Sequence, residues 1–311
     1  MRAICPKCTS THNRKKGIRY SPSFEGNVQR WYCHSCGKHF QTPIGSPKQE
    51  LPKILLFDIE TALMEVYVWG LYKQRIPHTN IIKDKDGSEK SWFVLSWAAK
   101  WLFDDNVQSD IVTPSESKSR NDKRILKSIW KLLDEAEIVI GHNLDRFDIR
   151  KLNARFIDND INPPSPFRSI DTLKVARKEF AFVSYKQDFL TKHFELENKL
   201  KTEFQLWVDC MQGDQTRLDE MAKYNRHDVM GLEQVYLKLR PYIKNHPNLG
   251  VLVDMDVCPT CGCEYLDETD SVYFTTANKF PVYRCQGCKT PYIRGKKNVN
   301  QDDTNMRSVA K

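Results

Sequence analysis

Short apolar runs and amphipathic segments alternate through the middle of the chain. Apolar residues recur at helical spacing over 122–135 and over about 216–239, and further helices are expected near Leu144 and within 171–194. Four short apolar runs predict strands, at 53–61, 93–102, 107–113 and 138–140. Strands followed by alternating strand and helix predict an α/β sheet with helices on its faces.

Polar and proline-containing segments divide the chain. Residues 41–48 have the composition of a linker, and Pro241 and Pro247 close the central region. The polar residues after Lys296 are typical of a disordered tail. The predicted organisation is an N-terminal module at 1–48, a core domain at 49–250, a C-terminal module at 251–295 and a disordered tail at 296–311.

The composition is that of a globular protein, with 40% hydrophobic and 28% charged residues over 311 positions. Because no run approaches the roughly 20 apolar residues of a membrane span and no signal-peptide pattern is present, we expect a cytoplasmic protein that does not bind membranes. The net charge of +8 is concentrated in residues 1–50, which hold nine Lys/Arg against two Asp/Glu. This excess either attracts a polyanion or simply keeps the surface soluble.

Eight of the ten cysteines form four C-x-x-C pairs, two near each end of the chain. Two such turns present four thiolates, which complete the tetrahedral coordination of a structural Zn²⁺. Cys263 and His34 lie close enough in the sequence to compete as ligands. The pattern predicts two zinc ions in two zinc ribbons, bound by Cys5, Cys8, Cys33 and Cys36 and by Cys258, Cys261, Cys285 and Cys288.

Basic and aromatic residues are interleaved in the first module. Such a surface can bind phosphates while its rings stack on bases, which predicts nucleic-acid contacts by Lys15, Lys16, Arg19, Arg30 and Trp31. The alternative is that Trp31 and its neighbour Tyr32 fill the small core of the ribbon. Residues 251–311 are electrically neutral, so a docking or architectural role for the second ribbon competes with contact to DNA.

Four acids and a tyrosine occupy positions that chemistry could use together. Asp58 and Glu60 share one face of a strand, Tyr224 and Asp228 share one face of a helix, and Asp148 lies at a strand-to-helix turn. Singly, each pattern is more often structural. Converging carboxylates would repel one another unless two Mg²⁺ or Mn²⁺ ions, about 3.5–4 Å apart, neutralised them and clamped a phosphodiester. The Tyr224 hydroxyl would then hold or deprotonate the attacking water.

As an ordered set, these residues resemble the motifs of the DnaQ-like (DEDD) exonucleases of the tyrosine subclass. Residues 57–61 are similar to the first motif, 143–148 to the second and 224–228 to the third. The histidine subclass has its histidine at the position that Lys223 occupies here. Stretches outside the motifs, at 66–70, 95–101 and 170–173, resemble the phage and bacterial YprB-like branch.

The resemblance implies an RNase H-like mixed sheet and a metal-dependent 3′–5′ exonuclease. It implies that Asp58 bridges both catalytic ions and that Glu60 and Asp228 complete the ion on the side of the nucleophile. Asp148 would serve the second ion, and Tyr224 would orient the attacking water.

Three further residues near the second motif have weaker assignments. By the resemblance, Asn143 would touch the terminal nucleotide; alternatively, it caps the following helix. Asp145 is an alternative acid of the second motif, and Asp171 is expected to support the structure.

The expected partner is single-stranded or 3′-ended DNA, in a bacterial or phage-infected cytoplasm, and proofreading would need a separate replication or repair protein. The alternatives are a ribonuclease with the same site, an endonuclease that cuts branched or internal sites, and a zinc-ribbon DNA-binding or adaptor protein whose nuclease fold is a scaffold.

Overall fold

The computed structural model describes residues 5–8, 10, 12–21, 26–43, 52–196, 202–253, 256–275, 279–294 and 306–308. Its contacts divide the chain into two compact units, Met1–Leu51 and Pro52–Lys311. The linker expected at 41–48 lies mostly outside the described residues, because 44–51 are not described.

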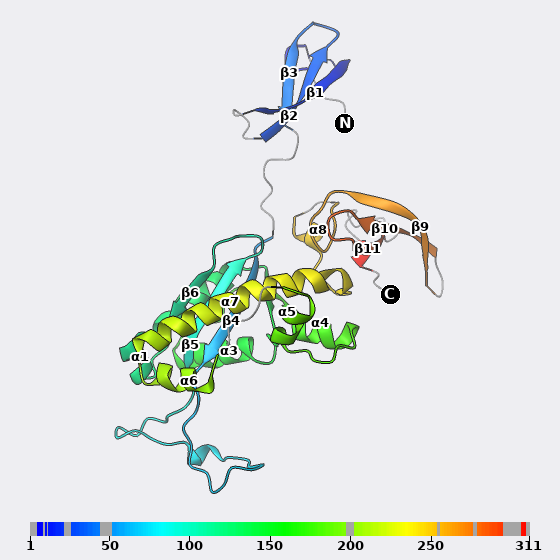
Figure 1. The fold of residues 1–311 in the computed structure, drawn as a ribbon. Coiled ribbons are helices and arrows are strands. Elements are labelled where there is room, and N and C mark those ends of the chain that lie inside the picture. The colour runs from blue at the N-terminus through cyan, green and yellow to red at the C-terminus, as the bar shows by residue number, and fades with distance from the viewer. Residues whose placement is uncertain are drawn as a thin grey trace. The chain divides into compact units, whose positions relative to one another are not determined.

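A five-stranded mixed sheet forms the centre of the second unit (Figure 1). Its order is β6-β5-β4-β7-β8, with β4 (Ile54–Thr61) in the middle. β4 pairs antiparallel with β5 (Val94–Trp101), and β5 pairs antiparallel with β6 (Gln108–Ile111). On the other side, β4 is parallel to β7 (Ile138–Gly141), and β7 is parallel to β8 (Arg168–Asp171). This arrangement confirms the predicted α/β class.

Alternate side chains of β4 enter two different cores, as the period-2 geometry of a strand requires. Leu55, Phe57 and Ile59 pack in the core that also contains the apolar face of α2 (Lys123–Glu135). Leu56 packs in the opposite core, together with residues of α7 (Gln215–Leu239), among them Val229, Leu232 and Tyr236. Asp58 and Glu60 continue the Leu56 series, so their side chains are directed towards the face that α7 covers.

Shorter helices surround this frame: α1 (Pro114–Lys118), α3 (Asp148–Asp158), α4 (Thr172–Glu179), α5 (Gln187–His193), α6 (Phe204–Met211) and α8 (Leu249–Leu252), with the 3₁₀ turns η2 (His78–Asn80) and η3 (Arg240–Tyr242). The sequence did not predict α1, α6 or β8. It placed the start of α3 near Leu144, whereas the helix begins at Asp148. The turn between them is closed by the Asn143 carbonyl, which accepts from the amides of Arg146 and Phe147, and Asn143 itself has a φ of 66°.

Each end of the chain carries a small antiparallel sheet. The first unit contains β1 (Asn13–Ser21), β2 (Gly26–Cys33) and β3 (His39–Pro43). The second sheet contains β9 (Leu266–Phe274), β10 (Lys279–Cys285), β11 (Pro291–Arg294) and β12 (Met306–Ser308). The pairing of β12 with β11 differs from the disordered tail predicted for 296–311; the other residues after 294 lie outside the described part. None of the described helices has the length and apolar character of a membrane span.

Candidate active site and metal centres

The end of β4 and the middle of α7 bring three carboxylates together. Asp58 and Glu60 come from the strand, and Asp228 comes from the helix face that packs on it. One carboxylate oxygen from each of the three lies within 4.8 Å of the other two. Three negative charges at this spacing would repel strongly, so the arrangement is suited to binding a divalent cation.

A buried asparagine fixes the orientation of Asp58. The Asn225 Nδ2 atom donates to Asp58 Oδ2 at 2.7 Å, and Ser96 Oγ donates to Asn225 Oδ1 at 3.1 Å. Asn225 is fully buried and Ser96 is 1% exposed. Because the amide oxygen is occupied by the serine, the amide nitrogen is directed at the carboxylate. The sequence analysis missed both residues. Asn225 could have been found from its position three residues before Asp228, which places the two on the same face of a helix.

A tryptophan on α6 contacts the other acid of β4. Trp207 Nε1 donates to Glu60 Oε2 at 3.2 Å, and its ring meets the ring of Tyr224 edge to face, with centroids 6.0 Å apart. The single donor of the indole therefore selects one oxygen of Glu60. Nothing in the local sequence pattern pointed to Trp207, which lies 147 positions from Glu60.

Asp148 approaches the site from a different direction and does not join the group of three. The parallel pairing of β4 with β7 covers Ile54–Leu56, and beyond it the Ile59 amide donates to Asp148 Oδ1 at 3.2 Å. Asp148 is 2% exposed, and burial raises its pKa to about 8, with the charges of Glu60 and Asp171 adding to the effect. Three of the four predicted acids therefore form one close group, and the fourth, Asp148, is buried against the backbone of β4.

Tyr224 lies beside the three carboxylates, as its position on α7 predicted, and is 7% exposed. Burial, followed by the negative charges of Asp228 and Glu60, raises the pKa of the Tyr224 hydroxyl well above its ordinary value. A hydroxyl in this environment keeps its proton at neutral pH. Of the two expected actions of Tyr224 on the attacking water, these surroundings favour holding it over deprotonating it.

A cleft of about 630 Å³ opens over these residues. Asp58, Glu60, Tyr224 and Asp228 line one part of it, while exposed Arg177 and Lys186 line another. Neither basic side chain forms an ion pair within the described part of the chain, so both can attract an anionic ligand. The cleft thus combines a cation-binding group of carboxylates with cationic side chains suited to phosphates.

His142 also lines the cleft, but both of its ring nitrogens have protein partners. Its Nδ1 lies 2.9 Å from Thr172 Oγ1, and its Nε2 lies 2.9 Å from the Tyr185 carbonyl oxygen. These contacts connect the end of β7 to α4 and to the loop before α5. The histidine therefore positions the wall of the cleft.

The residues around the second motif have structural partners. Asp171 accepts from the amides of Leu173 and Lys174, as the N-cap of α4, and from the Asn143 amide at 3.0 Å, which confirms its supporting role. Asp145 forms an ion pair with Lys174 at 2.6 Å. Asn143 does not cap α3, which has no side-chain cap. A contact of Asn143 with a nucleotide stays a prediction.

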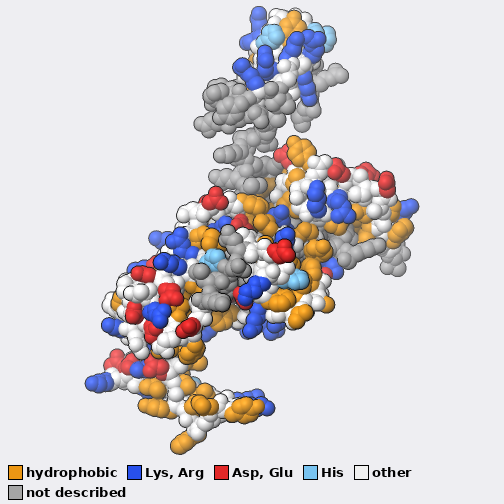
Figure 2. Space-filling view, viewed as in Figure 1, with side chains coloured by type: hydrophobic (Ala, Val, Ile, Leu, Met, Phe, Trp, Pro, Cys, Tyr) orange, Lys and Arg blue, Asp and Glu red, His pale blue; other side chains and the backbone are white. Residues whose placement is uncertain are grey.

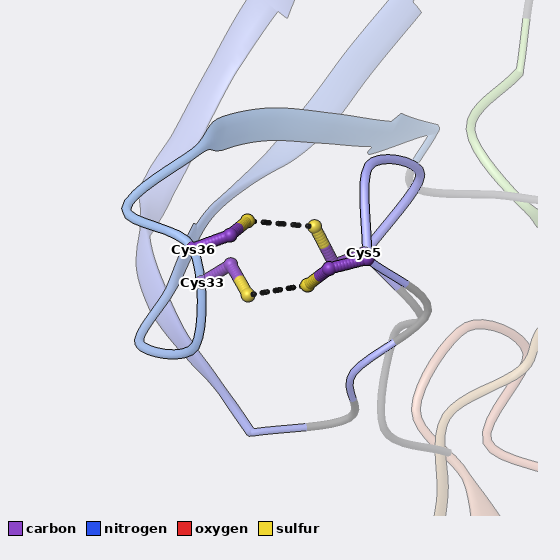
Figure 3. Close-up of side chains that lie close together, drawn as sticks. Cys5, Cys33 and Cys36 are labelled. Atoms are coloured by element: carbon purple, nitrogen blue, oxygen red, sulfur yellow. Dashed lines mark hydrogen bonds between the residues drawn. The ribbon is translucent and has the colours of Figure 1, made fainter.

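The N-terminal cysteines converge as the C-x-x-C spacing predicts (Figure 3). Cys5 Sγ lies 3.6 Å from Cys36 Sγ, and Cys8 Sγ lies 3.6 Å from Cys33 Sγ. These distances exceed a disulfide bond of about 2 Å and approach the roughly 3.8 Å between thiolates of a tetrahedral zinc site. The four sulfurs fit a structural zinc ion.

The C-terminal cysteines form the same arrangement with an added tyrosine. The Sγ atoms of Cys258 and Cys288 lie 3.6 Å apart, and those of Cys261 and Cys285 lie 3.5 Å apart. All four sulfurs form one group. The fully buried Tyr292 has its hydroxyl 2.8 Å from Cys258 Sγ. Cys263 and His34, considered above as rival ligands, do not belong to either group. Sequence reasoning missed Tyr292.

The structure separates the nucleic-acid contacts predicted in the first ribbon into two kinds. Lys15, Lys16, Arg19 and Arg30 are exposed on β1 and β2. Trp31 is 8% exposed and packs with Phe40 in the core of the ribbon. Trp31 therefore fills the small core of the first module, the alternative to nucleic-acid contact, because a ring buried there offers no face to a base.

Comparison with known proteins agrees with the topology of the central sheet. A model of the RNase H superfamily (RNase_H_2) matches residues 100–240, which include Asp148, Tyr224 and Asp228 but not Asp58 or Glu60. A search of curated proteins finds no match.

Among solved structures, the family B DNA polymerase from the hyperthermophilic archaeon Pyrobaculum calidifontis is similar over 74% of this chain and 29% of its own, with 14% identity and a TM-score of 0.44. This chain therefore spans less than a third of the polymerase. Together, the mixed five-stranded sheet and the match over residues 100–240 indicate an RNase H-like domain in the centre of the chain.

Proposed function

We propose that this protein is a metal-dependent nuclease that removes nucleotides from the 3′ end of a nucleic acid, DNA rather than RNA. The observation that carries the proposal is the convergence of Asp58, Glu60 and Asp228 within 4.8 Å in an RNase H superfamily domain. The basic residues of the cleft and the order of motifs along the chain support it further.

The donor set suits Mg²⁺ or Mn²⁺, because it consists of carboxylate oxygens without nitrogen or sulfur ligands. Asp58, Glu60 and Asp228 would hold one ion directly. Asp148, which is buried against the Ile59 amide of β4, would reach a second ion directly or through water. When bound, such ions supply charge stabilisation and water activation for phosphodiester hydrolysis.

The protein's own residues account for orientation in the reaction. Asn225 and Trp207 fix the carboxylates of Asp58 and Glu60, so the metal-binding oxygens are in place before substrate arrives. Tyr224 keeps its proton and donates it in a hydrogen bond that orients the attacking water. Arg177 and Lys186 bind phosphates of the strand that enters the cleft.

The two cysteine groups are proposed to hold structural zinc, since all four positions of each are filled by protein ligands. In the first ribbon, exposed Lys15, Lys16, Arg19 and Arg30 would add phosphate contacts to the same substrate.

The proposal is tested with 5′-labelled single-stranded DNA, duplex DNA and RNA, each with Mg²⁺, Mn²⁺ or neither ion. We expect a ladder that shortens from the 3′ end of DNA and requires the added ion. Asp58→Asn should lower the rate by at least about 10³-fold, because it removes a shared metal ligand.

The matched control is Asp145→Asn, which removes a neighbouring acid that pairs with Lys174 outside the cleft and should leave the rate unchanged. Metal-dependent cleavage that survives in Asp58→Asn would refute the site. A ladder on RNA but not on DNA would correct the substrate to RNA.

A further inference from the structure

A long connection between β4 and β5 forms an arm, residues 63–92, that extends from the body of the domain (Figure 1). Its base is a ladder of backbone hydrogen bonds. The Glu65 amide donates to the Lys90 carbonyl, and the Glu65 carbonyl accepts from the Ile82 amide. The Tyr67 amide donates to the Asn80 carbonyl. The Glu65 carboxylate is paired with Lys90 at 3.0 Å and with Arg120 from outside the arm. These backbone hydrogen bonds and ion pairs therefore hold the base of the arm to the domain.

The tip of the arm, residues 66–81, exposes an unusual set of aromatic side chains. Trp69 is 100% exposed, Tyr72 is 81% exposed and Tyr67 is 69% exposed. Single exposed apolar side chains are common on folded proteins, whereas a cluster of them usually marks an interaction site. Figure 2 shows hydrophobic side chains gathered along this segment. The rings contribute nothing to the described cores of the domain.

The charge of the tip identifies the kind of partner. Residues 66–81 contain Lys73 and Arg75 and no Asp or Glu, whereas the acids of the arm lie in its base at Glu65, Asp84, Asp86 and Glu89. The Lys73 ammonium lies 5.4 Å from the centre of the Tyr72 ring, so charge and ring are presented side by side. Exposed rings beside cations match the bases and phosphates of an unpaired nucleic-acid strand, with base–ring stacking worth about 1–3 kcal/mol per base.

The arm also starts at the candidate active site. It begins three residues after Glu60, close to the end of β4, and the Ala62 amide donates to the Phe93 carbonyl where the arm returns to the sheet. The Leu63 amide contacts Met211 Sδ at 3.3 Å, at the end of the helix that carries Trp207. The base of the arm therefore lies next to the end of β4 that carries the carboxylates.

We propose that the tip of the arm binds single-stranded nucleic acid, with Tyr67, Trp69 and Tyr72 stacking on unpaired bases and Lys73 and Arg75 contacting the backbone. The assignment of the bound strand as the one that enters the cleft rests on the proposed function. Binding by the tip does not, since its rings and charges lie outside the carboxylate site. Within a duplex the faces of the bases are stacked on one another, so the arm selects unpaired strands.

The test is the affinity of the full chain for fluorescent oligodeoxythymidine, measured by anisotropy in the Asp58→Asn background to prevent digestion. One variant carries Tyr67→Leu, Trp69→Leu and Tyr72→Leu, which keeps apolar side chains and removes the rings. Its matched control carries Phe at the same three positions, which keeps the rings. All three positions are exposed, so both variants should keep the thermal midpoint of the parent.

We expect the Leu variant to bind oligodeoxythymidine at least about tenfold more weakly, the equivalent of one lost stacking contact, and the Phe variant to bind within about threefold of the parent. Affinity for a blunt duplex should be the same in all three. Unchanged single-strand affinity in the Leu variant would overturn the proposal. An equal loss on the duplex would overturn the selection of unpaired strands.

A small substrate separates this proposal from the proposed function. In proteins that keep Asp58, hydrolysis of the p-nitrophenyl ester of thymidine 5′-phosphate reports the carboxylate site and is too small to reach the arm. The Leu variant should hydrolyse it at the parental rate. If the parent did not hydrolyse the ester or any nucleic acid, the nuclease would be refuted while the anisotropy result would still decide the role of the arm.

Discussion

At the residue scale, the four acids of the candidate site differ in their surroundings. Asp58 and Glu60 are partly exposed at the cleft, whereas Asp148 is 2% exposed and accepts a backbone amide of β4. Burial raises the pKa of Asp148 to about 8, far above the ordinary 3.8 of an aspartate. A carboxylic acid with such a pKa keeps its proton at neutral pH until a cation replaces it.

This protonation predicts that Mg²⁺ binding at pH 7 releases close to one proton if Asp148 serves a metal ion. The raised pKa means that the proton must be displaced below pH 8, so Mg²⁺ affinity should increase with pH up to about 8 and then level off. Calorimetric titration in two buffers of different ionisation enthalpy measures the released proton. Asp148→Asn should release none, and equal proton release in the variant and the parent would exclude Asp148 as the source.

The contact between Trp207 and Glu60 predicts a positioning role. Trp207→Phe removes the indole donor and retains a ring against Tyr224, so the fold should be unaffected. We expect about 10–100-fold weaker Mg²⁺ activation, the usual effect of losing a partner of a metal ligand. The measurement is the rate of DNA digestion as a function of Mg²⁺ concentration. A parental dependence on Mg²⁺ would show that the hydrogen bond is dispensable.

At the element scale, α7 determines which face the third motif presents. The helix begins after Gly213, and the Asp214 side chain caps it by accepting the Arg217 amide at 3.1 Å. Each helical residue turns the chain by about 100°, so a shift of one residue would rotate Tyr224 and Asp228 away from β4. The start of α7 is thus connected to the geometry of the site ten residues later.

A glycine in the turn before α7 makes a close contact whose contribution to stability can be tested. Gly213 has a φ of +76°, and a Cβ there would lie 2.6 Å from the Pro114 carbonyl oxygen. Gly213→Ala should therefore lower the free energy of unfolding by more than the about 1–2 kcal/mol of left-handed strain alone. Gly87→Ala is the matched control, because Gly87 has a φ of +85° with no atom within 4 Å of its added Cβ. Equal losses in denaturant unfolding would contradict the role of the close contact.

Elements with clear periodicity or a short apolar run, including the four-residue strands β6 and β7, were predictable from the sequence, whereas α1, α6 and β8 were not. The strands β4 and β5 and the helices α2 and α7 lie close to their predicted ranges. β8 has four residues, of which only Ile170 and Asp171 are buried, so its pattern carries little signal and pairing with β7 makes it a strand. The start of α3 was misplaced because Asn143 adopts a left-handed conformation that extends the turn to Phe147.

At the scale of the whole molecule, an RNase H-like domain is combined with two cysteine groups, one in each of the two compact units. Small antiparallel sheets with few buried side chains gain much of their stability from a bound metal. In the first unit the buried cluster consists of Cys5, Trp31, Cys33 and Phe40. The cysteines are thus part of the core that the ion would stabilise.

Elemental analysis of the purified chain should find two zinc ions per molecule. Cys258→Ser should lower this to one, because three thiolates bind zinc more weakly than four. Cys263→Ser is the matched control and should retain both ions, since Cys263 lies outside the group of four. Zinc absent from the parent chain, or lost equally in the two variants, would refute the assignment.

The sequence by itself determined the chemistry-bearing residues and the frame that carries them. Period-2 spacing placed Asp58 and Glu60 on one face, helical spacing did the same for Tyr224 and Asp228, and the C-x-x-C pairs identified the cysteines that converge in two groups of four. These patterns are local, since strand and helix geometry relate only residues that are close along the chain.

The tertiary structure decided what depends on distant segments meeting. The fold brought Asp148 to the Ile59 amide of β4, α6 brought Trp207 to Glu60, and α7 brought Asn225 to Asp58. The exposure of the arm's rings and the burial of Trp31 were decided in the same way, because burial depends on which surfaces pack together. Aromatic and basic residues are interleaved in both places, and the surrounding structure alone distinguishes an exposed ring from a core ring.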